Sequence, residues 1–327
     1  MSYPLPKDTA EMLGYGNGIG SNTGLALDKF RQVGEDWKIT DASKKRTDIP
    51  QPVSTLITNA LKRHKEMLKA LTGQQVRQFQ AMTDYRLVVG FGAEHVLETN
   101  LYLHRIYGFP LIPGSAIKGV ARACAFWEIA RHLELIAVDS TEMKRREKAD
   151  PKVPTPLMLL DELLSDGEAQ SLSREDKKEL RDRQEKMISR LREDELCRAL
   201  PKVQDLNFAE WQKLATTFYR VFGTTKRQGH VIFFDAYPLQ SPRLEPDILN
   251  PHFGDYYGGK TRPPADYGRP IPSFFLTVAK GTNFLFAVAS RDGDLADKAN
   301  EWLKGGLTDL GIGSKTSAGY GFMKSIS

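Results

Sequence analysis

The amino-acid sequence predicts an α+β fold built around an antiparallel sheet. Helical and strand-like patterns are interspersed along the chain, and several strand pairs are close enough in sequence to form antiparallel hairpins. This pattern favours α+β over a doubly wound parallel sheet. The chain has 327 residues, 40% of them hydrophobic, so a sizeable core is possible.

Helix and strand patterns can be assigned in order through the N-terminal half. Apolar residues separated by basic residues and glutamines predict a helix over residues 54–83. Alternating and apolar runs then predict strands at residues 85–91 and 101–107. The next helix is expected over residues 115–135, with Ser115 as its N-cap, because a serine hydroxyl accepts a hydrogen bond from a first-turn amide.

Residues 139–205 differ from the rest of the chain in charge density. Residues 134–210 hold 19 of the 41 acidic residues, interspersed with basic ones. Alternating charge signs are typical of solvent-exposed helices. We therefore expect residues 139–205 to be a charged helical insertion rather than core, with helices at residues 157–164 and 174–200.

Strands predominate in the C-terminal third, after a helix expected at residues 208–219. Apolar runs predict strands at residues 231–237, 273–278, 283–289 and 320–325. A short helix is expected at residues 295–303. Residues 238–272 show no clear periodicity and exceed an ordinary connection in length, which suggests a functional or mobile segment.

The charge distribution suggests a polyanionic partner. The formal net charge is +5, and no acid lies between Glu98 and Glu128, between Glu210 and Asp235, or after Asp309. Acid-free basic stretches attract phosphates, because no neighbouring carboxylate competes for the cations. Chance clustering of the acids is the alternative.

The sequence also bears on the cellular compartment. It has two cysteines, Cys124 and Cys197, too few for a disulfide framework. Neither a secretory signal pattern nor a long apolar run is recognisable. Together these features predict a cytoplasmic protein.

Two glycine-punctuated turns, about two hundred residues apart, carry the same chemistry. One spans residues 107–122 and the other residues 311–322; both are basic and lack carboxylates. Amides at a helix start, together with Lys or Arg, suit a sugar–phosphate backbone. The candidate contacts are Gly114, Ser115, Lys118, Arg122, Gly313, Ser314, Lys315 and Thr316. Solvent-exposed turns without a ligand are the alternative.

The second turn matches no nucleotide-binding motif. Ser314 separates Gly313 from Lys315, whereas a P-loop places glycine and lysine together. A dinucleotide fingerprint would need glycine where Thr316 stands, and the turn follows a helix rather than a strand. NTP and NAD binding by these motifs are therefore rejected, and no cofactor is expected.

Secondary contacts are expected in two further basic segments. Lys226 and Arg227 lie in a basic turn, and Lys260 and Arg262 lie among tyrosines within residues 238–272. Aromatics interleaved with bases can stack on unpaired nucleotides while cations hold the backbone. A surface loop whose tyrosines pack on the body of the protein is an equal alternative.

The histidines and Asp235 are candidates for other chemistry. The six histidines show no metal-ligand spacing, so no metal site is expected. His104 and His230 lie near basic residues and could perform acid–base chemistry on RNA, which leaves a metal-independent endoribonuclease as a rival function. Asp235 is expected to be a structural hydrogen-bonding carboxylate. A plain scaffolding protein is a second rival.

A set of motifs follows in order along the chain, at residues 22–29, 90–98, 112–119, 234–237, 255–257, 272–281 and 311–321. In these segments the sequence resembles the RAMP superfamily, the RNA-binding subunits of CRISPR effectors. Closer features resemble a backbone subunit of the Cmr complex, type III-B. The matches span residues 20–125 and 220–323, and the block at 139–205 has no matching signature.

The resemblance implies both a fold and a function. It implies a ferredoxin-like (RRM-like) core in one elaborated domain, 1–327, with residues 238–272 as a candidate thumb-like segment. It implies a subunit near the head of a guided complex that binds the 3′ part of the crRNA. The implied partners are crRNA, target RNA and the other Cmr subunits (backbone, small and head subunits). No catalytic residue carries over, so a non-catalytic subunit is expected.

Overall fold

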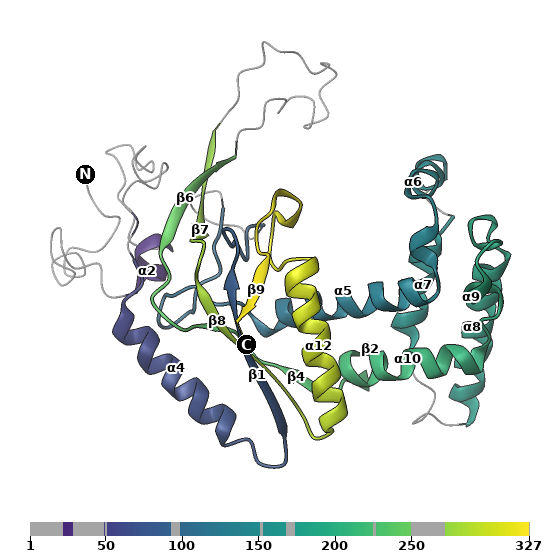
Figure 1. Ribbon diagram of the computed structural model, residues 1–327, viewed down its shortest axis with the longest axis horizontal. Helices are drawn as coiled ribbons and strands as arrows, with labels where there is room; N and C mark the ends of the chain where they lie inside the picture. The colour runs from purple at the N-terminus through teal and green to yellow at the C-terminus, as the bar shows by residue number, and fades with distance from the viewer. Residues whose placement is uncertain are drawn as a thin grey trace, which may run out of the picture.

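The computed structural model describes most of the chain (Figure 1). The described residues are 22–28, 49, 51–92, 99–150, 153–167, 174–224, 227–249 and 272–326. Within them, no helix is long and apolar enough to cross a membrane. Helices and antiparallel strands are mixed, which confirms the α+β prediction.

A five-stranded antiparallel sheet forms the centre of the molecule. Its main path runs β4 (Val231–Phe233), β8 (Asn283–Ser290), β1 (Gln75–Thr83) and β9 (Met323–Ile326), and β5 (Tyr237–Pro238) also pairs with β8. In the register of β1 with β8, Phe79 lies opposite Phe286, and their rings stack 5.2 Å apart. The sheet has β4 at one edge and β9 at the other.

Two long helices pack together against this sheet. They are α5 (Gly114–His132) and α12 (Gly293–Asp309), and α12 also contacts β8, β1 and β9. A Cβ atom on Gly306 would lie 2.7 Å from the Val120 carbonyl oxygen, so only glycine permits this close helix crossing. Asp292 caps α12 by accepting hydrogen bonds from the amides of Asp294 and Leu295.

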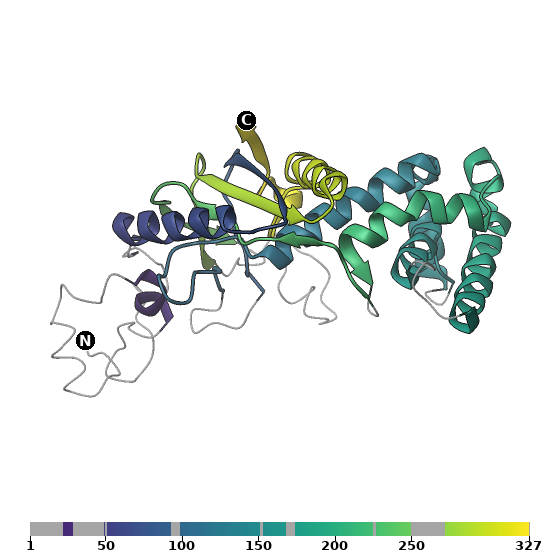
Figure 2. The ribbon, with the colours of Figure 1, turned by 90° about the horizontal axis from the view of Figure 1, so that it is seen from below.

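Five further helices form an arm that extends sideways from the sheet (Figures 1 and 2), whereas α4 (Ser54–Lys69) and the short α2 (Thr23–Asp28) lie on the opposite side of the molecule. The helical arm comprises α6 (Ser140–Ala149), α7 (Pro156–Asp166), α8 (Arg174–Glu193), α9 (Pro201–Gln204) and α10 (Phe208–Phe222), with short 3-10 turns at Leu135–Ala137 and Glu195–Cys197. Side-chain caps at Thr155 and Asn207 begin α7 and α10.

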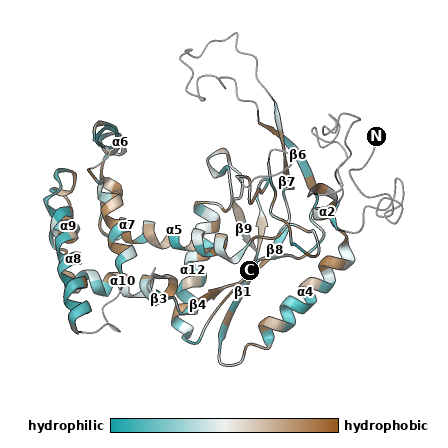
Figure 3. Ribbon diagram, turned by 180° about the vertical axis from the view of Figure 1, so that it is seen from behind, coloured by the Kyte–Doolittle hydropathy of each residue, from teal (hydrophilic) through white to brown (hydrophobic). Residues whose placement is uncertain are grey.

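The helical arm has an apolar interior of its own. Figure 3 shows α8 as mostly hydrophilic, in keeping with its charged sequence. Yet Leu160, Leu163 and Leu191 are fully buried and belong to the same core as the sheet. The helical character predicted for residues 139–205 is confirmed, whereas the prediction that they are not core is wrong. Their apolar residues recur at helical spacing and pack α7, α8 and α10 together.

A two-stranded ribbon projects from the sheet (Figure 1). It pairs β6 (Leu244–Leu249) with β7 (Ser273–Val278) in antiparallel register. At its base, Val278 forms a bridge with Leu87, and the Ala279 amide donates to the Arg243 carbonyl. Residues 250–271, which make up most of the 238–272 segment, lie outside the described residues.

Four predicted elements differ from the structure. The helix expected over residues 54–83 ends early, as α4 (Ser54–Lys69), and residues 75–83 form the strand β1. The glutamines and arginine of β1 are typical of an exposed helix surface, which explains the helix prediction. In the structure β1 pairs with a strand on each side, and the alternate residues Phe79, Ala81 and Thr83 are buried.

The segments 85–91 and 101–107 are not strands and form only isolated bridges, at Leu87 and Leu103. The strand expected at 231–237 is divided into β4 and β5. In each of these segments, backbone or side-chain groups form hydrogen bonds to loops or to a helix start.

Candidate nucleic-acid interface

The glycine-rich loop, residues 311–321, folds around the segment that follows β1. The Ser314 amide donates to the Val88 carbonyl at 2.8 Å, and the Gly321 amide donates to the Arg86 carbonyl at 2.9 Å. Gly313 has φ of 94°, and a Cβ there would lie 2.3 Å from the Val88 oxygen. This close approach requires glycine at position 313. The Ser314 amide, which the sequence predicts to contact a phosphate, is already bonded within the protein.

Lys315 is the cation at the centre of the loop. It has φ of 62°, in the left-handed region that non-glycine residues seldom adopt. Its Nζ lies 5.1 Å from the ring centroid of Phe275, 5.7 Å from that of Phe91 and 5.9 Å from that of Tyr320. The side chain is half-buried, and neighbouring Thr316 is half-buried as well. Ring faces hold an ammonium group without pairing it with a carboxylate, so it remains available to an anion.

The start of α5 is already occupied by a carboxylate of the protein itself. The Gly114 amide donates to Asp235 Oδ1 at 2.7 Å, and a Cβ on Gly114 would lie 2.3 Å from the Phe233 carbonyl oxygen. Asp235 is thus a structural hydrogen-bonding carboxylate, as predicted, and it places negative charge at the positive end of the helix dipole. The Gly114 amide is therefore not free for a phosphate.

The predicted cap of α5 is wrong by two residues. Pro113 is the N-cap, and Ser115 lies exposed within the first turn. The backbone of Ile112 pairs with that of Ala236, which brings the chain after β4 close to the helix start. That pairing lets Asp235 take the position a capping serine would otherwise fill.

The two basic residues of α5 have different surroundings. Lys118 is half-buried and has no ion-pair or hydrogen-bond partner among the described residues. Arg122 pairs with Asp161 of α7 at 2.9 Å, and its guanidinium lies 5.3 Å from the Phe218 ring centroid of α10. Arg122 thereby joins α5 to the helical arm, and a carboxylate 39 residues away neutralises part of its charge.

The secondary contacts can be placed only in part. Arg227 lies exposed on β3 (Arg227–Gln228), which forms a small hairpin with β2 (Gly223–Thr224). Lys226, Lys260 and Arg262 lie outside the described residues.

The two glycine-punctuated turns lie at opposite edges of the sheet. Gly114 contacts the end of β4, at one edge of the sheet, whereas the glycine-rich loop leads into β9, at the other. Three strand spacings of about 4.8 Å separate these edges by about 14 Å. A ligand common to both would have to extend over several nucleotides.

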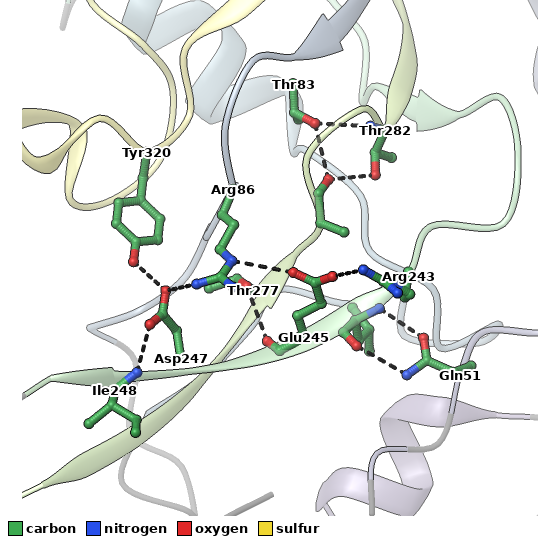
Figure 4. A network of polar contacts seen from close by, with 12 residues as sticks. Gln51, Thr83, Arg86, Arg243, Glu245, Asp247, Ile248, Thr277, Thr282 and Tyr320 are labelled. Carbon is green, nitrogen blue, oxygen red and sulfur yellow. Dashed lines mark hydrogen bonds and ion pairs between the residues drawn. The ribbon is translucent and has the colours of Figure 1, made fainter. Parts of the chain in front are cut away.

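A polar network beside the loop was not anticipated from the sequence (Figure 4). Asp247 of β6 accepts hydrogen bonds from Tyr320 Oη at 2.5 Å and from Arg86 Nη1 at 2.6 Å. Arg86 also bonds to Glu245 at 3.3 Å, and Glu245 pairs with Arg243. The acids and Arg86 are separated by about 160 residues, so local spacing gave no signal for this network.

Burial and hydrogen bonding fix the protonation states in this network. Burial, together with the hydrogen bond to Asp247, raises the pKa of Tyr320 to about 12. Burial alone would raise the pKa of Asp247, but hydrogen bonds from Tyr320, Ile248 and Arg86 lower it below its ordinary value. At neutral pH the phenol is therefore a donor and the carboxylate an ionised acceptor.

An exposed aromatic residue also lies at the loop. Tyr85 retains 42% of its surface exposed, and its ring meets that of Tyr320 edge-on at 5.3 Å. The Arg86 guanidinium lies 5.7 Å from the Tyr85 ring centroid. A partly exposed ring beside cations is suited to stacking on a base. The adjacent Tyr and Arg were the only signal for it in the sequence.

The histidines considered for acid–base chemistry occupy different settings. Nδ1 of His104 accepts hydrogen bonds from the amides of Ile106 and Tyr107, and its ring packs on Tyr107 and Phe109. Burial lowers the pKa of His104. His230 is exposed. Across the part of the chain that the structure describes, no cluster of three His, Cys, Asp or Glu side chains could hold a metal ion.

Comparison with known proteins identifies the family. Residues 80–324 match the model of the RAMP superfamily. The CRISPR system Cmr subunit Cmr6 of Pyrococcus furiosus is 36% identical over 312 residues, which cover 90% of this chain and 80% of that protein. Cmr6 of Saccharolobus solfataricus is 29% identical over 102 residues, 31% of this chain and 34% of that protein.

One solved structure of a relative is also similar. The crystal structure of Cmr6 from Pyrococcus furiosus aligns with a TM-score of 0.43 at 34% sequence identity, over 77% of this chain and 99% of that one. The superfamily model spans most of the sequence, and the Pyrococcus relative is similar over nearly all of it. The chain therefore belongs to the RAMP superfamily and, within it, to the family of the CRISPR subunit Cmr6.

Proposed function

We propose that this protein is a non-catalytic, crRNA-binding backbone subunit of a type III-B Cmr complex, near the head of the complex where the 3′ part of the guide lies. The observation that carries the proposal is the 36% identity to Pyrococcus Cmr6 over 90% of the chain. In this role its partners are crRNA, target RNA and the neighbouring Cmr subunits, and it works in the cytoplasm.

The sheet connectivity supports a ferredoxin-like core for this function. The elements β1, α5, β4, β8, α12 and β9 follow one another in a β-α-β-β-α-β arrangement, with the arm and the ribbon as insertions. The strand order β4-β8-β1-β9, with every neighbouring pair antiparallel, is the order of a split βαβ fold. The ribbon β6–β7 is the base of the thumb-like segment.

The proposed RNA contacts are cations rather than amides. Lys118 has no partner among the described residues, and Lys315 has ring faces but no carboxylate beside it. Tyr85 would add a stacking surface next to Tyr320, one of the rings that surround Lys315. Arg122 contributes less, because Asp161 neutralises it.

Reversing both charges tests this assignment. In a reconstituted complex, Lys118→Glu with Lys315→Glu should weaken crRNA binding about tenfold or more. The dependence on salt should become less steep by about 1.4 in log–log slope, since two single-strand phosphate contacts are lost. Filter-binding titrations at several salt concentrations measure both quantities.

A matched charge reversal serves as the control. Lys148→Glu changes an exposed lysine of α6, on the helical arm, and should leave affinity and slope unchanged. Unchanged affinity in the double variant would show that these lysines do not hold the guide.

The absence of catalysis is a separate prediction. The pure protein, incubated with repeat RNA in EDTA, should yield no defined cut, because the His104 Nδ1 is engaged with backbone amides inside a packed turn. A discrete product that disappears in His230→Ala or His104→Ala would replace the proposal with a guide-processing endoribonuclease. Gel analysis of end-labelled RNA distinguishes the two outcomes.

A further inference from the structure

The position of Lys315 is determined by three segments that are distant in sequence. Phe91 follows β1, Phe275 belongs to β7 of the ribbon, and Tyr320 belongs to the glycine-rich loop. The Phe91 and Phe275 rings meet at 87° with centroids 5.1 Å apart, and Phe275 lies 6.2 Å from Tyr320. These rings form an aromatic cage around one ammonium group, and one of its walls comes from the ribbon.

The ribbon also fixes a second wall of the cage. Tyr320 is 7% exposed, and its hydroxyl donates to Asp247 of β6. Because the acceptor is an ionised carboxylate, this is a charge-assisted hydrogen bond, stronger than one between neutral groups. Asp247 is held in turn by Arg86 and by the Ile248 amide (Figure 4).

Backbone contacts join the same three segments. The loop amides of Ser314 and Gly321 bond to the segment after β1, and Leu87 of that segment pairs with Val278 at the ribbon base. The loop therefore cannot move relative to the ribbon without breaking hydrogen bonds on both sides of Lys315.

Lys315 has no counter-ion to hold it in place. Among the described residues no carboxylate pairs with it, so its position rests on the rings and on its own left-handed backbone conformation. A cation placed by ring faces leaves its ionic interactions free for a phosphate, whereas a salt-bridged lysine would have to exchange partners.

We propose that the ribbon β6–β7 positions Lys315 for phosphate binding, with Asp247 and Phe275 acting on the lysine through Tyr320 and the aromatic cage. This inference rests on the proposed RNA-binding function and deepens it. Binding of RNA to the ribbon and binding of RNA to the glycine-rich loop are then energetically coupled, because both depend on the same arrangement of rings. Asp247, Phe275 and Tyr320 are positioning residues, and Lys315 is the contact.

A double-mutant cycle tests the coupling. Tyr320→Phe keeps the ring and removes the hydroxyl, and Asp247→Asn removes the charge of the acceptor. Each is measured alone and together with Lys315→Gln, as crRNA affinity of the reconstituted complex at several salt concentrations. Each single positioning variant should weaken binding about threefold to tenfold when Lys315 is present and less than about twofold when it is absent. Lys315→Gln alone should lower the salt slope by about 0.7.

The controls separate positioning from stability. Asp297→Asn removes an acid that also pairs with an arginine, Arg77, but lies outside the cage, and it should leave affinity unchanged. Thermal melting identifies variants that lose their fold; if Asp247→Asn does, Tyr320→Phe alone decides the cycle, because it preserves the packed ring.

The outcomes distinguish the inference from the function on which it rests. If the losses caused by Tyr320→Phe and Lys315→Gln simply add, the ribbon does not act through Lys315, and the inference is overturned while RNA binding stands. If Lys315→Gln changes neither affinity nor slope, Lys315 is not a phosphate contact and the inference fails again. If the wild-type subunit contributes nothing to crRNA binding in the complex, the proposed function itself fails.

Discussion

Trp302→Ala is expected to lower the free energy of unfolding by about 4 kcal/mol, the usual cost of truncating a large buried aromatic side chain. Trp302 of α12 is 3% exposed, and its ring stacks on Phe222 of α10 with centroids 5.5 Å apart. Its indole N–H donates to Glu128 of α5 at 2.9 Å. Trp302 thus connects α12 and α5, the two helices packed against the sheet, to α10 of the helical arm.

Trp302→Phe is the matched control. Phenylalanine keeps a ring against Phe222 but is smaller than the indole, and it loses the hydrogen bond to Glu128, whose side chain is 43% exposed and can be rehydrated. A cost of about 2 kcal/mol is expected, from the lost hydrogen bond and the small cavity together. Urea unfolding followed by circular dichroism measures both variants, and equal losses would show that the ring does not hold the helical arm.

Gly321→Ala is expected to cost about 3 kcal/mol, because strain and overlap act together. Gly321 has φ of 74°, and an added Cβ would lie 1.9 Å from the Ile312 carbonyl oxygen, inside the turn of the glycine-rich loop. The loop would have to open to admit the methyl group, and the hydrogen bond from Gly321 to Arg86 would be strained. Thermal or urea unfolding measures this cost, and crRNA affinity should fall with it.

Gly319→Ala provides the comparison within the same loop. Its φ is 89°, but an added Cβ would have nothing within 4 Å. Only the backbone cost of about 1 kcal/mol is expected there. A similar loss at both positions would contradict the role assigned to the close approach at Gly321.

The sequence predicts the helices of this fold better than its strands. The helices expected near residues 115–135, 208–219 and 295–303 are present as α5, α10 and α12, and the residues that they bury recur at helical spacing. β1 was misread as helix because long-range pairing, rather than local composition, makes it a strand. The segment 85–91 carries a strand-like pattern, but its carbonyls accept bonds from the glycine-rich loop.

The charge distribution along the sequence did not predict the electrostatics of the candidate site. Stretches free of acids in sequence are not free of acids in space: Asp235 reaches Gly114 from 121 residues away, and Asp161 reaches Arg122. The sequence singled out Lys118 and Lys315, which the fold leaves without a carboxylate partner among the described residues. It could not show the rings around Lys315, because Phe91 and Phe275 come from separate segments.

The carboxylate at the start of α5 has a consequence for how the molecule responds to its surroundings. With Asp235 bonded to Gly114, the start of α5 already has a carboxylate of the protein at its amide, so its geometry should not depend on whether a strand of nucleic acid is present. Lys315 has no such internal anion. An arriving polyanion can therefore pair with Lys315 directly, whereas at the β4 end it would meet Lys118 beside a helix start whose amide already has its partner.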